Sequence, residues 1–253
     1  MKLCAKIFML IYIALSFNAS ASAPYLTLDS ANKAYSGEKY DKAIAMYNSF
    51  INDGYESSQV YFNIGNCYYR KADYARAILN YEKAKKLNPS DADIQFNLQI
   101  ANLKTTDKIT PDSELFLANW WHKLVDISSE KGWAITCILL LFIALLSISS
   151  YLVSRNLFIR QLGFWLGMLL LAFSLITFLF SREQYNAITS HDTAIVMSGS
   201  VTVKASPADN GTQLFIIHEG AKVWIVKSEG TWTEVKLANG SQGWLLTSDI
   251  EAI

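Results

Sequence analysis

The sequence has few charged side chains, and the shortage is confined to one stretch. Charged residues make up 17% of the 253 residues, against about 25% in a typical soluble domain. Between Gly132 and Ser181 the only charged residues are Arg155 and Arg160. With 51% hydrophobic residues, this composition excludes an intrinsically disordered chain and argues against a single soluble globule.

An excess of positive charge is also missing. Residues 24–110 carry 11 basic and 10 acidic side chains, and residues 182–253 carry 5 basic and 8 acidic ones. A protein that binds nucleic acid neutralises phosphates with clustered Lys and Arg, and neither segment has such a composition. We therefore expect no nucleic-acid partner.

Cysteine is scarce, with three in the chain. Cys4 falls in an expected signal peptide and Cys137 in an apolar run, so Cys67 has no partner for an intramolecular disulfide. A buried structural thiol fits Cys67 better than a nucleophile, because it lies on the packing side of an expected helix. The sequence has no metal-ligand spacing of Cys and His, no nucleotide-binding loop and no hydrolase motif. We expect no cofactor, no metal and no enzymatic activity.

The N-terminus has the pattern of a secretory signal peptide over residues 1–21. Lys2 and Lys6 precede an apolar run, Ile7–Phe17, which is too short to cross a bilayer about 30 Å thick. Small residues follow and predict cleavage after Ala21 or after Ala23. Retention as an N-terminal anchor is the alternative.

Two later apolar runs, residues 132–154 and 162–181, are each long enough to form a transmembrane helix. The loop between them, residues 155–161, contains Arg155 and Arg160, and the positive-inside rule places it in the cytoplasm. Both ends of the mature chain then lie in the periplasm, on the side to which the signal peptide delivers the N-terminus. The alternative is a pair of buried helices in a soluble protein.

Residues 111–131 predict an amphipathic helix that lies on the outer leaflet before the first span. Its apolar residues recur at helical spacing, and Trp120 and Trp121 favour the headgroup region of a bilayer. A linker helix packed on a neighbouring domain is the alternative. In the second span, Gly163 and Gly167 form a small-residue motif that allows close approach of another helix, either the first span or a partner.

Residues 24–105 show self-similarity at a spacing of 34 residues. Tyr40 matches Tyr74, and Tyr47 matches Tyr81. This period and these residue types resemble the tetratricopeptide repeat, with units at 24–57 and 58–91 and a capping helix at 92–105. The resemblance implies a helical stack that binds peptides or proteins.

In the tetratricopeptide family the first helix of each pair lines a concave groove. The resemblance therefore implies a peptide or partner groove in which amide and guanidinium groups hold an extended chain. The residues it assigns to this groove are Asn32, Tyr35, Phe62, Asn63, Asn66, Tyr69, Arg70 and Phe96. The alternative is a solvated polar surface.

From residue 192 to residue 253 the apolar period changes to two, which predicts short β-strands separated by turns. Asn239-Gly240 between two such strands is a strong hairpin signal. The stretch from Gly230 to Trp244 resembles bacterial SH3-type domains, which implies a small all-β barrel. Trp232 and Trp244 could form an aromatic contact surface for cell-wall peptides or proteins, and burial in the core is the alternative for each.

The order of these segments predicts a multi-domain chain: α-helical tetratricopeptide repeats, two transmembrane helices and a small SH3-like barrel. The whole arrangement resembles the tetratricopeptide membrane protein of the Bat aerotolerance operon (BatE type). The resemblance implies partners with von Willebrand factor A domains and a MoxR-type ATPase, in oxidative or envelope stress tolerance.

Two functional hypotheses follow from the sequence. The first is an inner-membrane scaffold that binds envelope proteins through periplasmic repeats and contacts the lipid bilayer through its spans. The second is a cell-wall peptide receptor or sensor that reads its ligand through the SH3-type domain. The groove around Asn66 and Arg70 is the feature that favours the first, and exposure of Trp232 and Trp244 would favour the second.

Overall fold

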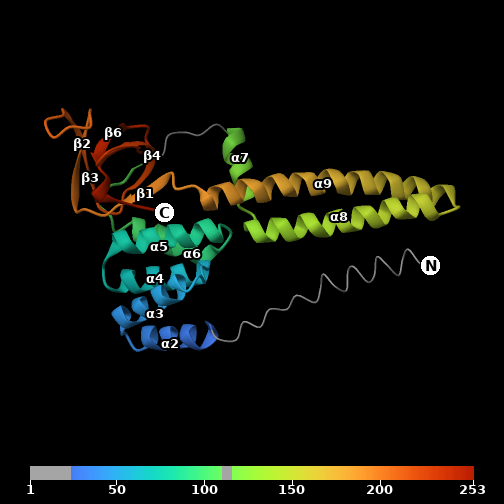
Figure 1. The fold of residues 1–253 in the computed structure, drawn as a ribbon, viewed down its shortest axis with the longest axis horizontal. Coiled ribbons are helices and arrows are strands. Elements are labelled where there is room, and N and C mark those ends of the chain that lie inside the picture. Colours follow the sequence, from blue (N-terminus) through green and yellow to red (C-terminus); the bar gives the residue numbers. More distant parts are fainter. Residues whose placement is uncertain (1–23, 110–115) are drawn as a thin grey trace. The chain divides into compact units, whose positions relative to one another are not determined.

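A computed structural model describes residues 24–109 and 116–253 of the chain (Figure 1). The expected signal peptide, residues 1–21, and the first residues of the expected juxtamembrane helix, 111–115, lie outside the described residues. The chain divides into two compact units, residues 1–55 and residues 56–253. The boundary falls between the two expected repeats.

The described part of the first unit is a helical hairpin of α2 (Pro24–Ser36) and α3 (Tyr40–Asn52). Small and aromatic side chains fill the contact between the helices, with Ala31, Ala43 and Tyr47 each at most 1% exposed. The Tyr47 hydroxyl donates to Asn32 Oδ1 at 2.6 Å. The polar pair joins the two helices of the hairpin.

The second unit begins with the next hairpin, α4 (Ser58–Arg70) and α5 (Tyr74–Leu87), followed by α6 (Ala92–Asn102). Ser57 caps α4 by accepting from the Val60 N–H, and Asp73 caps α5 in the same way from Arg76. Pro89 lies between α5 and α6, where a helix cannot continue. Capping and proline placement therefore fix where these helices begin and end.

The two hairpins repeat the same details 34 residues apart. The turn residues Glu38 and Ala72 both have positive φ, 58° and 61°. The Tyr81 hydroxyl donates to Asn66 Oδ1 at 2.8 Å, as Tyr47 does to Asn32. Since backbone, aromatic and polar features recur together, the sequence period corresponds to a structural repeat of two helices.

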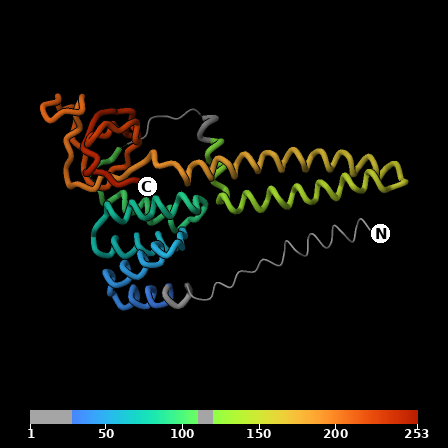
Figure 2. The backbone as a smooth tube through the Cα atoms, in the orientation of Figure 1, coloured from blue at the N-terminus to red at the C-terminus, as the bar shows by residue number. Residues whose placement is uncertain are grey.

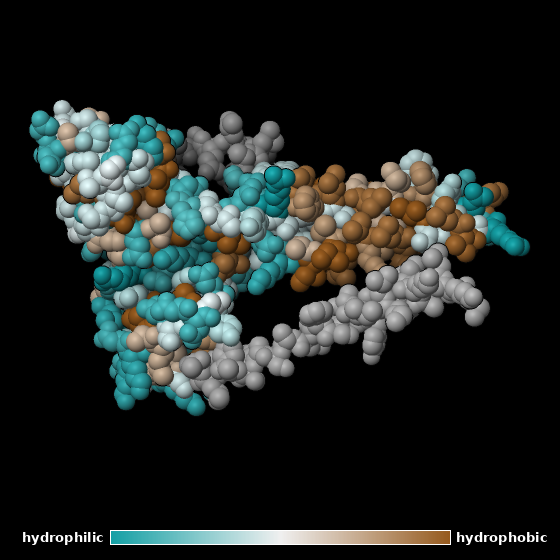
Figure 3. All heavy atoms as spheres, viewed as in Figure 1, coloured by the Kyte–Doolittle hydropathy of each residue, from teal (hydrophilic) through white to brown (hydrophobic). Residues whose placement is uncertain are grey.

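Two long apolar helices follow a short one. The short helix α7 (Phe116–Val125) ends well before α8 (Glu130–Val153), and α9 spans Leu157–Thr189. The helices α8 and α9 lie side by side as a hairpin (Figure 2). Both are long and apolar enough to cross a membrane, and hydrophobic side chains gather over their surface (Figure 3).

Small residues form the contact between α8 and α9. A Cβ atom added to Gly163 would lie 2.7 Å from the Ser147 carbonyl oxygen, and one added to Gly167 would lie 3.3 Å from that of Ala144. Ser174 donates to the Cys137 carbonyl oxygen at 3.1 Å. The two glycines therefore pack against the preceding helix of the same chain.

The C-terminal segment is a seven-stranded antiparallel sheet with the order β3-β2-β6-β5-β4-β1-β7. Its strands are β1 (Thr193–Val196), β2 (Ser200–Lys204), β3 (Gln213–His218), β4 (Lys222–Glu229), β5 (Trp232–Lys236), β6 (Gln242–Leu246) and β7 (Ile250–Ala252). The expected Asn-Gly turn joins β5 to β6, with Gly240 at φ 81°.

The sheet has two edges, β3 and β7, and no strand pairing in residues 193–252 joins them. The structure therefore shows an open antiparallel sheet in place of the expected closed barrel. A register shift between Val203 and Lys204 bends the β2–β3 pair. The Asp107 carboxylate accepts the His218 backbone N–H at 2.6 Å.

The sheet packs on the second repeat. Ile195 of β1 and Ile253, which follows β7, are buried in one cluster with Ile78 and Leu79 of α5 and Leu98 of α6. Lys222 and Glu82 form an ion pair at 2.8 Å across the same contact. The helices of the second repeat and the sheet thus share a hydrophobic core.

Candidate functional site

The predicted groove residues of α2 have partners within their own hairpin. Asn32 accepts a hydrogen bond from Tyr47, and the Tyr35 ring packs edge-on against Tyr40 with centroids 5.7 Å apart. Both residues lie in the first unit. Their structural contacts are therefore those of a repeat core and its turn.

Asn66 of α4 is engaged in the second repeat. Its Oδ1 accepts from the Tyr81 hydroxyl at 2.8 Å and from Asn97 Nδ2 at 2.9 Å. These bonds tie α4 to both α5 and α6. Asn63, one turn earlier, accepts from Gln59 at 3.1 Å on an exposed surface.

The other predicted groove residues of the second unit divide by burial. Phe62 and Tyr69 are half-buried against the cluster that the second repeat shares with the sheet. Arg70, at the end of α4, and Phe96 of α6 are exposed. The prediction that these residues bind a partner stays a prediction.

The two predicted tryptophans of the sheet differ. Trp244 is 5% exposed and belongs to the interior. Trp232 is half-buried beneath the Lys204 ammonium, 5.0 Å from the ring centroid, and it lines a hollow of about 540 Å³. The burial of Trp244 counts against an aromatic surface made by both rings, and a contact role for Trp232 stays a prediction.

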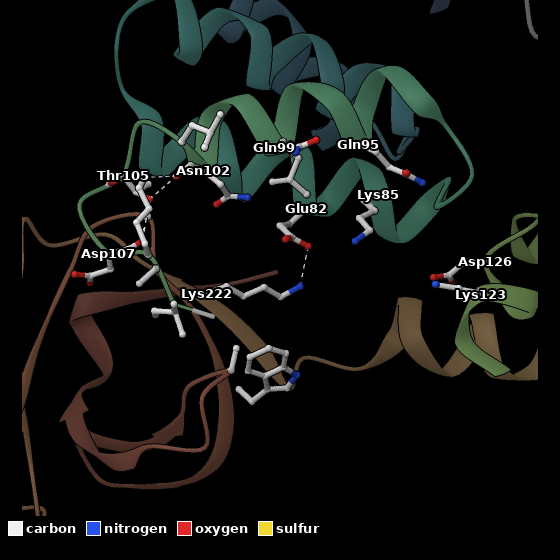
Figure 4. A pocket seen from close by; sticks show the side chains of 18 of the residues that line it. Glu82, Lys85, Gln95, Gln99, Asn102, Thr105, Asp107, Lys123, Asp126 and Lys222 are labelled. Carbon is white, nitrogen blue, oxygen red and sulfur yellow. Dashed lines mark hydrogen bonds and ion pairs between the residues drawn. The ribbon is translucent and has the colours of Figure 1, made fainter. Parts of the chain in front are cut away.

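A larger cleft lies between the second repeat and the sheet (Figure 4). Its volume is about 960 Å³. Side chains of α5 and α6 form one wall and β4 forms the other. Lys123 of α7 and the turn residues Asp126 and Ile127 also line the cleft. The Glu82–Lys222 ion pair bridges the two walls. Local sequence pattern does not predict this cleft, because its walls come from residues about 140 positions apart.

Burial changes the acidity of Lys86 in α5 and of Tyr61 in α4. Lys86 donates to the carbonyl oxygens of Ser190 and Ile253, and burial lowers the pKa of its ammonium. Burial also raises the pKa of the Tyr61 phenol, and its hydrogen bond to Glu56 adds to this shift. Lys86 thus links α5 to the residues that follow α9 and β7, and Tyr61 links α4 to the residues before it.

Within residues 24–109 and 116–253 there is no group of three or more His, Cys, Asp or Glu side chains that could hold a metal ion. Cys67 is buried in the second repeat.

The helices α4 and α5 form the second helical hairpin of the repeat. Residues 58–91 match the tetratricopeptide repeat family. The match covers the second of the two structural repeats. A comparison with curated proteins found no match. Tetratricopeptide repeats act by binding other proteins, so a protein-interaction role is indicated for this part of the chain.

Proposed function

We propose that this protein is a scaffold of the bacterial inner membrane that binds envelope proteins through periplasmic tetratricopeptide repeats. The observation that carries the proposal is the combination of a protein-binding repeat with a hairpin of two lipid-compatible helices. In this role the chain acts as an adaptor between proteins and carries out no catalytic step.

The exposed surface of the hairpin supports membrane insertion. Leu139, Leu146, Trp165 and Leu175 are each more than half exposed. Exposed apolar side chains at this density are costly in water and favourable in hydrocarbon. The buried side of each helix is narrow and faces the other helix, as expected for a pair that spans a bilayer together.

The contact between repeat and sheet supports placement of both soluble segments on one side of the membrane. Lys86 reaches Ser190 and Ile253, and Asp107 reaches His218, although α8 and α9 lie between these residues in the sequence. Two spans return the chain to its starting side, which allows these contacts. Arg160 near the turn between the spans favours the cytoplasm for that turn, which places the soluble segments in the periplasm.

Topology is tested by attaching a reporter that is active only in the cytoplasm. Fusion after Ile253 should give an inactive reporter, and insertion between Ser154 and Leu157 should give an active one. The matched control is the same reporter on a chain from which α9 is deleted, which should reverse the C-terminal result. Activity of the fusion after Ile253 in the intact chain would contradict the proposed orientation.

The resemblance to the Bat aerotolerance membrane protein sharpens the proposal. It suggests envelope partners with von Willebrand factor A domains and a role in oxidative or envelope stress tolerance. Photo-crosslinking in intact cells from exposed groove positions, Arg70 and Phe96, tests for such partners. Position 42, an exposed lysine of α3, serves as the control. Absence of any crosslinked protein at both groove positions would argue against the scaffold.

A second candidate is a receptor that reads cell-wall peptides through an SH3-type C-terminal domain. The hollow beside Trp232 favours it, and the burial of Trp244 weakens it. The full chain in detergent should then sediment with purified peptidoglycan, and Trp232→Ala should abolish sedimentation while Trp120→Ala should not. If the unaltered chain stays in solution, the scaffold is favoured.

A further inference from the structure

The cleft between the second repeat and the sheet has a row of amide side chains along one wall. Gln95, Gln99 and Asn102 all line it from α6. At 1.5 Å rise per residue, the three side chains spread over roughly 10 Å of the helix. Three residues of an extended peptide also span about 10 Å. The spacing therefore suits amides that hydrogen-bond to successive peptide groups of an extended chain.

The amides of Gln99 and Asn102 retain hydrogen-bonding capacity. Gln95 Nε2 donates to the Pro89 carbonyl oxygen, which fixes its side chain and leaves Oε1 to accept. Within residues 24–109 and 116–253, the side chains of Gln99 and Asn102 have no hydrogen-bond partner. Asn102 projects from α6 toward the sheet (Figure 4). An amide donates and accepts, as a peptide main chain requires.

The charges of the cleft favour an acidic ligand. Four ammonium groups line it, those of Lys85, Lys108, Lys123 and Lys222, against the three carboxylates of Glu82, Asp107 and Asp126. Glu82 forms an ion pair with Lys222, while Asp107 bonds to His218 and Asp126 accepts from the Gln184 amide.

The ammonium groups of the cleft are less fully engaged. Lys108 donates to the carbonyl oxygens of Asn102 and Thr105. In the described part of the chain, Lys85 and Lys123 form no ion pair or hydrogen bond through their side chains. Two ammonium groups therefore remain to attract carboxylates.

Apolar side chains complete the cleft. Trp224 of β4 is 39% exposed, and Leu103 and Ile127 are more than 60% exposed. Aromatic and aliphatic surface of this kind, next to a few polar groups, is the usual composition of a ligand site. It offers contact area for side chains that alternate with the acidic ones along an extended chain.

We propose that this cleft binds an extended, acidic segment of a partner protein. The α6 amides hold its main chain, Lys85 and Lys123 bind its carboxylates, and Trp224 contacts an intervening apolar side chain. This inference rests on the proposed scaffold function and moves the binding site from the predicted groove to the boundary between repeat and sheet.

Fluorescence anisotropy with the full chain in detergent micelles tests the proposal. The probe is a fluorescein-labelled hexapeptide of alternating glutamate and valine, and the reference probe has lysine in place of glutamate. The acidic peptide should bind and the basic one should not. Lys85→Glu combined with Lys123→Glu should raise the Kd of the acidic peptide by about tenfold or more. Lys42→Glu, a lysine of the first unit, should leave it unchanged.

Main-chain recognition is tested separately with Gln99→Ala combined with Asn102→Ala. These exposed substitutions should leave the unfolding transition in place and raise the Kd by several fold. Equal affinity for both peptides, no effect of the lysine reversals, or full displacement by millimolar inorganic phosphate would each overturn the proposal. The last result would identify a site for small anions.

Photo-crosslinking from position 99 separates this proposal from the scaffold itself. If a partner crosslinks from Arg70 or Phe96 but never from position 99, the scaffold stands and the cleft does not bind it. If no position crosslinks a partner, the scaffold function fails first. Crosslinking from position 99 that is lost in the double lysine reversal would support both.

Discussion

Tyr81 lies at the centre of the second repeat and shows how single residues set its geometry. It is 1% exposed, its hydroxyl donates to Asn66, and its ring packs against Phe62 with centroids 5.8 Å apart. Gly65 faces the same ring from α4. Tyr47 and Asn32 repeat the polar part of this arrangement in the first hairpin. The aromatic residue needs a small neighbour for its ring and an amide for its hydroxyl.

Gly65→Ala should destabilise the second repeat. An added Cβ would lie 2.6 Å from two atoms of the Tyr81 ring, which is held by its own hydrogen bond. Overpacking costs about 1–3 kcal/mol, while replacing a helical glycine returns up to about 1 kcal/mol. The net free energy of unfolding should fall, measured by urea titration followed by circular dichroism. Gly199→Ala, which meets no atom within 4 Å, is the control, and equal stability of both variants would contradict the argument.

Asn66→Ala should also destabilise the fold, by about 1–3 kcal/mol, because it leaves the Tyr81 hydroxyl and the Asn97 amide without their acceptor. Asn210→Ala, at an exposed position, should change the free energy of unfolding by less than about 0.5 kcal/mol. A loss of partner binding in Asn66→Ala would therefore report on folding. Unchanged stability in this variant would restore Asn66 as a groove residue.

Tyr61 predicts a dependence of stability on alkaline pH. Burial and the bond to Glu56 raise the pKa of its phenol above the ordinary value of 10.0. Above pH 10 the unfolded chain loses this proton while the folded chain keeps it, so the free energy of unfolding falls as pH rises. Tyr61→Phe should reduce this fall between pH 9 and pH 11, measured by denaturant titration. Tyr185→Phe, at an exposed position, should keep the slope of the unaltered chain.

The α8–α9 hairpin is an element whose stability depends on small residues. Gly163 and Gly167 bring the two backbones close, and Ser174 bonds to the main chain of α8. Packing and polar contacts of this kind hold helices together where lipid removes the hydrophobic driving force. The sequence predicted the small-residue motif but left open which helix it meets. Spacing within one helix does not identify the helix that faces it.

Gly163→Leu should separate α8 from α9. Cys137 Sγ lies 3.4 Å from Ser174 Oγ, so Ser174→Cys supplies a reporter that should crosslink to Cys137 on mild oxidation. The crosslink should form in the Ser174→Cys chain and be lost when Gly163→Leu is added. Trp165→Leu, at a position 70% exposed, should leave it intact. Persistence of the crosslink in the Gly163→Leu chain would show that the contact between α8 and α9 tolerates a larger side chain.

At the largest scale that the structure describes, the second unit is organised by the contact between the second repeat and the sheet. The period of 34 predicted the repeats, and the period of two predicted the strands, because each pattern reflects burial within one element. The contact of Ile78 with Ile195 and Ile253 has no such signature. The cleft could not be read from local pattern, because it depends on which surfaces meet after folding, and the sequence left open whether Trp244 is buried.

Reversal of the Glu82–Lys222 pair tests this contact. Glu82 is 8% exposed, and its carboxylate lies 2.8 Å from the Lys222 ammonium. Lys222→Glu should place two like charges together and loosen the sheet from the repeat, which raises hydrogen exchange in α5 and β1. Adding Glu82→Lys should restore protection. Failure of the double reversal to recover protection would mean that the apolar cluster alone determines docking.

The contact between the repeat and the sheet can be completed only after the C-terminal residues have been synthesised. Lys86 and its partner Ile253 are separated by 167 positions. At roughly 5–20 residues per second, the ribosome finishes α5 about 8–33 s before Ile253 exists. For that interval the apolar face of α5 and α6 has no sheet to cover it, while the two long helices are being synthesised. A chaperone that binds exposed helical repeats during translation would act in this interval. Docking of the last strand would then cover the surface that the chaperone binds.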